Sequence, residues 1–183
     1  MNDNSFKCCF TGYRPAKFPF KLSCGDTGYV EFENDLISEI LRLTTDGCNT
    51  FYTGMAMGFD IIAAEVVSLL KVARPDLKIK LVCVLPYENQ GESFGDFWKE
   101  KFFNVLSKAD EKIVISENYH KGCYQMRNEY MVDNCDLVLT WYDGKAGGTR
   151  NTLDYAIEKG RKVINICKNK CENFAIQTVF ELF

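Results

Sequence analysis

The chain has 183 residues, of which 46% are hydrophobic and 26% charged, and its formal charge is −3 at neutral pH. This composition excludes a disordered or collagen-like chain, and the length is sufficient for one folded core. The acidic balance argues against a broad nucleic-acid surface, which is normally basic, and leaves room for a local site that binds a small anion.

Histidine and cysteine restrict the chemistry further. His120 is the one histidine, so a His-rich metal site is excluded, and we expect it in a surface loop. The nine cysteines are scattered, form no CxxC pair and mostly lie in apolar runs. They predict neither disulfides nor a metal site, but buried thiols in a reducing cytoplasm. The start of the chain lacks a signal-peptide pattern, and no apolar run is long enough to span a membrane.

Strand-like and helix-like segments alternate along the chain. The predicted strands are 6–11, 50–53, 79–85, 112–115, 137–141 and 162–166. The predicted helices are 29–44, 59–73, 96–109, 124–135 and 152–159, with a final helix in 171–183. Continuous apolar strands separated by helices predict a single α/β domain over 1–183: a Rossmann-like, doubly wound, mostly parallel sheet of about six strands, with helices on both faces. In such folds ligands bind beyond the carboxyl ends of the strands.

The loop after the first strand contains Thr11, Gly12 and Arg14. Glycine permits close backbone approach, and arginine can bind phosphate or carboxylate oxygens. Taken alone, this loop is better explained as a tight turn with a solvated arginine.

The loop after the second strand runs directly into a helix and contains Gly54, Met55, Gly58 and Asp60. Its amides can face an anion at the positive end of the helix dipole. Asp60 is predicted foremost as the N-cap of the helix, and alternatively as a contact to a ribose hydroxyl.

The loop after the fifth strand contains Asp143, Gly147, Gly148 and Thr149. Two glycines and a hydroxyl at a helix start suit a phosphate group. The alternative is a glycine-rich turn in which Thr149 is the N-cap. A second glycine-bearing loop at the same sheet edge favours the binding interpretation.

Arg127 and Asn128 belong to the helix before the fifth strand. An arginine near a helix start is unfavourable beside the positive dipole end, and an anionic ligand would relieve this. The alternative is a surface arginine paired with a carboxylate.

Ordered motifs resemble one family, the YpsA family of the SLOG superfamily. They are Thr11-Gly12-Tyr13-Arg14-Pro15, Gly54 through Asp60, Pro86 through Gln90, Arg127 through Asp133, and Asp143-Gly144 followed by Gly147-Gly148-Thr149. The resemblance extends from about residue 6 to residue 167. Tyr13 is a departure, because the family usually has histidine there, and a proton-transfer role in that loop is weakened.

The resemblance implies a Rossmann-like fold and relatives of two kinds: DprA, which binds single-stranded DNA, and the LOG phosphoribohydrolases, which cleave nucleoside monophosphates. The LOG catalytic glutamate position falls on Thr152 here, and threonine cannot carry the negative charge that this hydrolysis needs. We therefore expect a cytoplasmic binding protein or sensor for a nucleotide or ADP-ribose-like ligand, and assign no catalytic residue. Alternatives are N-glycosidic hydrolysis through Asp60, Asp143 or Glu129, and DprA-like DNA binding, which the net charge disfavours.

The expected ligand-binding residues are Thr11, Gly12, Arg14, Gly54, Met55, Gly58, Asp60, Arg127, Asn128, Asp143, Gly147, Gly148 and Thr149. The phosphate is expected at Gly147-Gly148-Thr149, with Arg127 or Arg14 as the counter-charge. The predicted helix 59–73 is apolar around most of its circumference, so either the fold covers it on two sides or it forms a homodimer.

Overall fold

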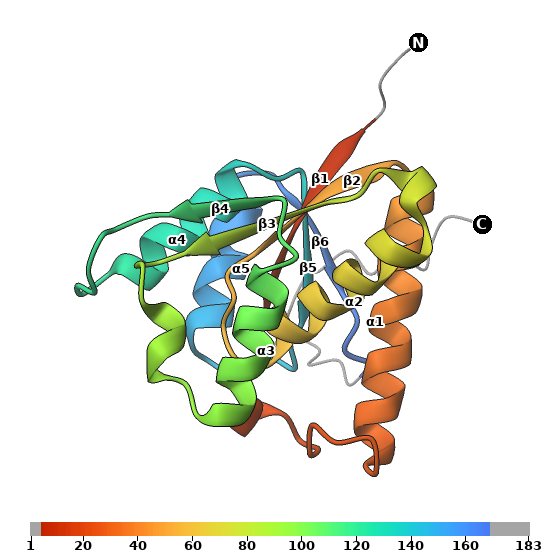
Figure 1. The fold of residues 1–183 in the computed structure, drawn as a ribbon, viewed down its shortest axis with the longest axis horizontal. Coiled ribbons are helices and arrows are strands. Elements are labelled where there is room, and N and C mark those ends of the chain that lie inside the picture. Colours follow the sequence, from red (N-terminus) through yellow and green to blue (C-terminus); the bar gives the residue numbers. More distant parts are fainter. Residues whose placement is uncertain (1–4, 169–183) are drawn as a thin grey trace.

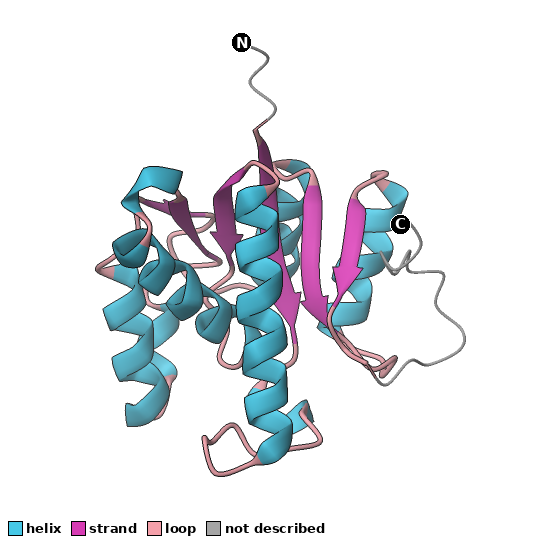
Figure 2. Cartoon of the chain, turned by 90° about the vertical axis from the view of Figure 1, so that its right-hand side faces the viewer, coloured by secondary structure: helices cyan, strands magenta, loops and turns pink. Residues whose placement is uncertain are grey.

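A computed structural model describes residues 5–168, and the helix predicted within 171–183 lies outside them. The described chain forms one six-stranded sheet in the order β4-β3-β2-β1-β5-β6, with every neighbouring pair parallel. The strand arrows run in one direction in Figure 2. The strands are β1 (Phe6–Gly12), β2 (Cys48–Thr53), β3 (Lys80–Leu85), β4 (Glu111–Val114), β5 (Leu137–Trp141) and β6 (Lys162–Asn165). The predicted α/β class is confirmed.

Within residues 5–168, five α-helices cover the two faces of this sheet (Figure 1). They are α1 (Thr27–Thr45), α2 (Phe59–Ala73), α3 (Asp96–Leu106), α4 (Cys123–Asp133) and α5 (Gly148–Glu158). α2 packs between α1 and α3 on one face, and α4 packs against α5 on the other. The strand order reverses between β1 and β5, so this pair is the switch point at which doubly wound folds place ligands.

The strands are continuous apolar runs because helices cover them on both sides. All five residues of β5 are buried, as are the last five of β3. Seven of the eight described cysteines are buried with them, and Cys24 is the exposed one. These thiols fill space in the core as small hydrophobic side chains.

The apolar helix α2 is covered within the chain by α1, α3 and the sheet. Nine of its residues are buried, and Leu69 and Val72, near its end, remain 68% and 81% exposed. The first of the two predicted explanations therefore accounts for most of its apolar surface. No helix among residues 5–168 is both long enough and apolar enough to cross a membrane.

Candidate functional site

The loops that the sequence singled out meet at the carboxyl edge of the sheet. The hydroxyl of Thr149 donates to the carbonyl oxygen of Gly12 at 3.0 Å, which joins the start of α5 to the end of β1. The amide of Phe59 donates to the carbonyl oxygen of Tyr13 at 3.0 Å, which joins the start of α2 to the same loop. The predicted convergence of separate loops at one edge is therefore present in the fold.

Arg127 is the centre of this region and is only 4% exposed. Its Nη1 donates to the carbonyl oxygen of Gly54, and its Nε donates to Oδ1 of Asn128 at 2.7 Å. A side chain at Gly54 would overlap the guanidinium, so this approach requires glycine. We call Gly54, Asp60, Arg127, Arg14 and Gly148 together the edge site.

The helix start is within one residue of its predicted position, but Arg127 lies further from the positive end of the helix than expected. α4 begins at Cys123, one turn earlier than the Arg127 motif, so the arginine lies in the second turn. The alternative of an exposed, carboxylate-paired arginine is wrong, because the side chain is buried. Burial lowers the pKa of Arg127, and the nearby carboxylate of Asp60 opposes that shift.

Asp60 is buried beside this arginine, with 5% of its surface exposed. The predicted N-cap role is wrong: Gly58 is the N-cap of α2, and Asp60 lies in the first turn. Gly58 has a φ of 96°, which glycine adopts without strain. Burial raises the pKa of Asp60 to about 6, although Arg127 and Arg14 both act to lower it.

Gln90 also holds the loop after β2, a role that the sequence did not reveal. Its Nε2 donates to the carbonyl oxygens of Met55 at 2.8 Å and Gly54 at 3.3 Å. Its Oε1 is buried with no hydrogen-bond partner. Met55 itself is fully buried with a φ of 54°, so its side chain is not available to a ligand. Thr11 is likewise buried, within β1 opposite Thr140.

The start of α5 presents backbone rather than a side-chain cap. Its N-cap is Gly147, and the hydroxyl of Thr149 is used by Gly12, so Thr149 as N-cap is wrong. No other heavy atom lies within 4 Å of the position that a Cβ of Gly148 would take, apart from its chain neighbours and the backbone of its own helix. Open space therefore adjoins Gly148 in the first turn of this 11-residue helix, while the ammonium of Lys17 lies beside Gly147 and donates to the carbonyl oxygen of Ala146 at 2.9 Å.

Tyr13 and Asp143 form a pair across the switch point that sequence analysis did not predict. The buried Tyr13 hydroxyl donates to Oδ1 of Asp143 and accepts from the amide of Lys145 at 3.2 Å. The ammonium of Lys145 lies 2.7 Å from Oδ2 of Asp143. Burial raises the pKa of Tyr13; for Asp143, burial is outweighed by hydrogen bonds from Lys145 and Tyr13, which lower its pKa.

Thr152, where the resemblance implies a glutamate, supports the start of α5. Its hydroxyl donates to the carbonyl oxygen of Gly148 and accepts from Nδ2 of Asn128, both at 2.9 Å. Asn128 in turn accepts from Arg127. This chain of bonds links the buried arginine to the open helix end.

Arg14 is the exposed cation of the edge site. Its guanidinium carbon lies 5.6 Å from the centre of the Tyr124 ring. His120 is exposed, as expected, and interacts with Ser116 and the carbonyl oxygen of Lys121. Within residues 5–168, no three His, Cys, Asp or Glu side chains are grouped as a metal ion would require.

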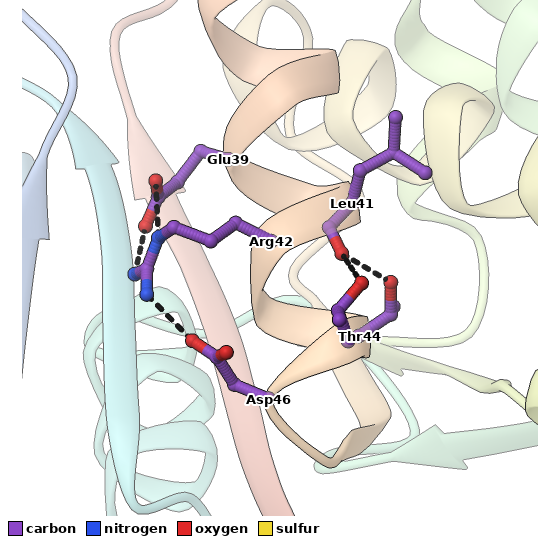
Figure 3. Close-up of polar contacts among 6 residues, drawn as sticks. Glu39, Leu41, Arg42, Thr44 and Asp46 are labelled. Atoms are coloured by element: carbon purple, nitrogen blue, oxygen red, sulfur yellow. Dashed lines mark hydrogen bonds and ion pairs between the residues drawn. The ribbon is translucent and has the colours of Figure 1, made fainter.

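A hollow of about 300 Å³ lies at the opposite, amino-terminal edge of the sheet, next to Arg42. This arginine is already bound by two carboxylates, Glu39 at 2.6 Å and Asp46 at 2.6 Å (Figure 3). Its charge is neutralised at the end of α1, which indicates a structural role rather than a second anion site.

Comparison with known sequences finds one matching family model and several bacterial relatives. The YpsA model, which describes the YspA SLOG family, matches residues 8–177. An uncharacterised SPbeta prophage-derived protein, YoqJ of Bacillus subtilis, is 32% identical over 69% of this chain and 81% of its own length. A UPF0398 protein of Halalkalibacterium halodurans is 28% identical over 83% of this chain and 78% of its own length.

Two solved structures of DNA processing protein A share the fold. That from Helicobacter pylori, described as having a unique single-stranded DNA binding mode, is 18% identical with a TM-score of 0.60, and the match covers 89% of this chain. That from Streptococcus pneumoniae is 16% identical with a TM-score of 0.58 over 89% of this chain. The chain spans 66% and 50% of those two proteins, respectively.

Proposed function

This chain belongs to the YpsA SLOG family, and from that membership together with the geometry of the edge site we propose that it binds a nucleotide or nucleotide-derived ligand in the cytoplasm. The ligand's phosphate would lie at the amino end of α5. The observation that carries the proposal is the start of α5, where Gly147 is an N-cap without a side-chain hydrogen bond, open space adjoins the Cβ position of Gly148, and the ammonium of Lys17 lies beside Gly147. A reducing compartment suits the many buried free thiols.

The counter-charge is supplied by Arg14 rather than Arg127. The guanidinium of Arg127 is committed to Gly54 and Asn128. Arg14 is exposed, and its charge acts on both Asp60 and Tyr124. The backbone between Gly54 and Gly58 would contact the sugar side, with the hydroxyl of Thr149 retained by Gly12 as a support of the loop.

A thermal-shift titration tests the proposal with adenosine monophosphate, other nucleotides and ADP-ribose at millimolar concentration. A ligand with a Kd one hundredth of its concentration stabilises the folded state by about 2.7 kcal/mol, which is readily measured. Gly148→Ala provides the site control, because its methyl group would fill the space in front of the helix amides. Absence of a shift with every nucleotide refutes the proposal.

Nucleotide hydrolysis is the second candidate, favoured by the raised pKa of Asp60. A carboxyl group with a pKa of about 6 is partly protonated near neutral pH and is suited to acid–base chemistry. Release of ribose 5-phosphate from nucleoside monophosphates, lost in Asp60→Asn, would establish this reaction. Binding without release limits the protein to a sensor.

Single-stranded DNA is the third candidate, because the fold matches DNA processing protein A. The net charge of −3 works against it. Titrations of a fluorescent oligonucleotide and of a mononucleotide at several salt concentrations distinguish strand binding from mononucleotide binding. The affinity for a strand falls steeply with salt, whereas the affinity for a mononucleotide with one phosphate depends only weakly on salt.

A homodimer through α2 is a further proposal that rests on exposed Leu69 and Val72. Light scattering at micromolar concentration tests it, with Leu69→Glu and Val72→Glu expected to dissociate the dimer. A monomeric mass for the unmodified protein ends the proposal.

A further inference from the structure

Three tyrosines form a cluster next to the edge site: Tyr87 after β3, Tyr119 after β4 and Tyr124 in the first turn of α4. The ring centres of Tyr87 and Tyr119 lie 5.6 Å apart, those of Tyr87 and Tyr124 6.0 Å, and those of Tyr119 and Tyr124 6.2 Å. The hydroxyls of Tyr87 and Tyr124 lie 3.3 Å apart. We call these three residues the tyrosine cluster.

The tyrosine cluster is not part of the buried core. None of its members is among the core residues, and Tyr119 is 64% exposed. The rings of Tyr87 and Tyr119 meet edge to face, at an interplanar angle of 81°. Edge-to-face contacts are a preferred arrangement of aromatic pairs, and the high exposure of Tyr119 leaves much of this residue accessible to solvent. A preformed aromatic surface of this kind is suited to another planar ring.

Two arginines connect the tyrosine cluster to the edge site. The guanidinium carbon of Arg14 lies 5.6 Å from the centre of the Tyr124 ring, and that of Arg127 lies 6.0 Å from the same centre. Arg127 also donates to the carbonyl oxygen of Gly54. Aromatic faces and cationic groups therefore follow one another along the sheet edge, as the base and phosphate of a nucleotide do.

We propose that the tyrosine cluster is the platform on which the nucleobase of the ligand stacks, with Tyr119 supplying the exposed ring. This inference rests on the proposed nucleotide-binding function and adds the part of the ligand that is recognised. The base faces the tyrosines, Arg14 lies between base and phosphate, and the phosphate lies towards Gly148. Because every base has an aromatic face, stacking alone selects for a base and not for its identity.

The test compares adenosine monophosphate with ribose 5-phosphate, which has the same sugar and phosphate but no base, by isothermal titration calorimetry. Stacking on an aromatic residue corresponds to about a 5- to 150-fold gain in affinity, so the monophosphate should bind tighter by this factor. Tyr119→Ala should reduce that ratio towards one, and Tyr119→Phe, which keeps the ring, should preserve it. Phe97→Ala removes a similarly exposed ring, 60% accessible, from α3 on the other face of the sheet and should leave the ratio unchanged.

The outcomes separate this inference from the function on which it rests. Equal affinities for the two compounds overturn the platform and leave phosphate and sugar binding intact. Failure of both compounds, and of every nucleotide and ADP-ribose in the thermal-shift titration, to bind overturns the proposed function together with the platform. If a thymidine oligonucleotide binds tighter than thymidine monophosphate and loses affinity in Tyr119→Ala, the base arrives as part of a strand, which supports the platform.

Discussion

Arg127 and Gly54 are 73 positions apart in the chain and are joined by a hydrogen bond from the guanidinium to the glycine carbonyl. The bond connects α4, on one face of the sheet, to the loop that leads from β2 into α2, and α2 covers the other face. It also places a buried positive charge next to the buried carboxyl of Asp60. The two halves of the edge site therefore depend on one side chain.

Arg127→Met should destabilise the protein strongly. The substitution keeps apolar length, but Gly54 and Asn128 lose their donor, and Asp60 loses the positive charge that most favours its ionised form. Removing one partner of a buried charge system costs about 3 kcal/mol in the free energy of unfolding, measured by urea denaturation. Arg127→Lys retains the charge without the fork and should lose less. Unchanged stability in Arg127→Met would contradict the structural role of the arginine.

Gly54→Ala and Gly148→Ala should differ sharply in stability. A methyl group at Gly54 overlaps the Arg127 guanidinium, whereas one at Gly148 meets no neighbouring group. We expect Gly54→Ala to lower the free energy of unfolding by about 2 kcal/mol. Gly148→Ala should be neutral or stabilising by up to about 1 kcal/mol, because alanine favours helix. Gly148→Ala should instead lose nucleotide affinity. Equal nucleotide affinity of Gly148→Ala and the unmodified protein would argue against a phosphate at the start of α5.

Asp60 should make the protein less stable as the pH rises through about 6. The folded protein keeps this carboxyl protonated up to about pH 6, whereas in the unfolded chain it ionises near 3.8. The stabilising contribution is therefore complete below about pH 4 and is lost by about pH 7, a change of roughly 3 kcal/mol.

The measurement is the free energy of unfolding of Asp60→Asn minus that of the unmodified protein, at pH values from 4 to 7. The difference should grow with pH, since asparagine does not titrate. Carboxyls with lowered pKa, such as Asp143, titrate in both proteins and cancel in the subtraction. A difference that is constant with pH would place the pKa of Asp60 at its ordinary value.

Tyr13→Phe should loosen the loop between β5 and α5. The hydroxyl of Tyr13 bonds both Asp143 and the amide of Lys145, and phenylalanine loses these bonds while keeping the ring. We expect a loss of about 1.5 kcal/mol in stability and faster hydrogen exchange at the Lys145 amide. Tyr155→Phe is the matched control, because the hydroxyl of Tyr155 donates to the exposed carboxylate of Asp133. This substitution should lower the free energy of unfolding by less than about 0.5 kcal/mol. Equal effects of the two substitutions would contradict the structural role of Tyr13.

The strands were predictable because buried parallel strands are continuous apolar runs. β5 matches its predicted range, and the others differ by a few residues at their ends. Convergence of the loops was predictable because the carboxyl ends of parallel strands share one edge. The roles of individual side chains were less predictable: Asp60 was expected foremost as a helix cap and Thr149 was the alternative cap of its helix, and in each case a glycine takes that place.

The sequence by itself determined the doubly wound sheet and the edge at which the site lies, since apolar periodicity and glycine-bearing loops are local properties of the chain. Only the tertiary structure decided which polar groups are hydrogen-bonded within the protein and which remain exposed to a ligand. Tyr13 is hydrogen-bonded to Asp143, 130 positions away, and Arg127 is hydrogen-bonded to the carbonyl oxygen of Gly54. Arg14 is exposed, and open space adjoins Gly148 in the first turn of α5. Those pairings depend on packing between distant segments, and the pKa of Asp60 is raised by burial. Neither the pairings nor the pKa shift can therefore be read from a local pattern of residues.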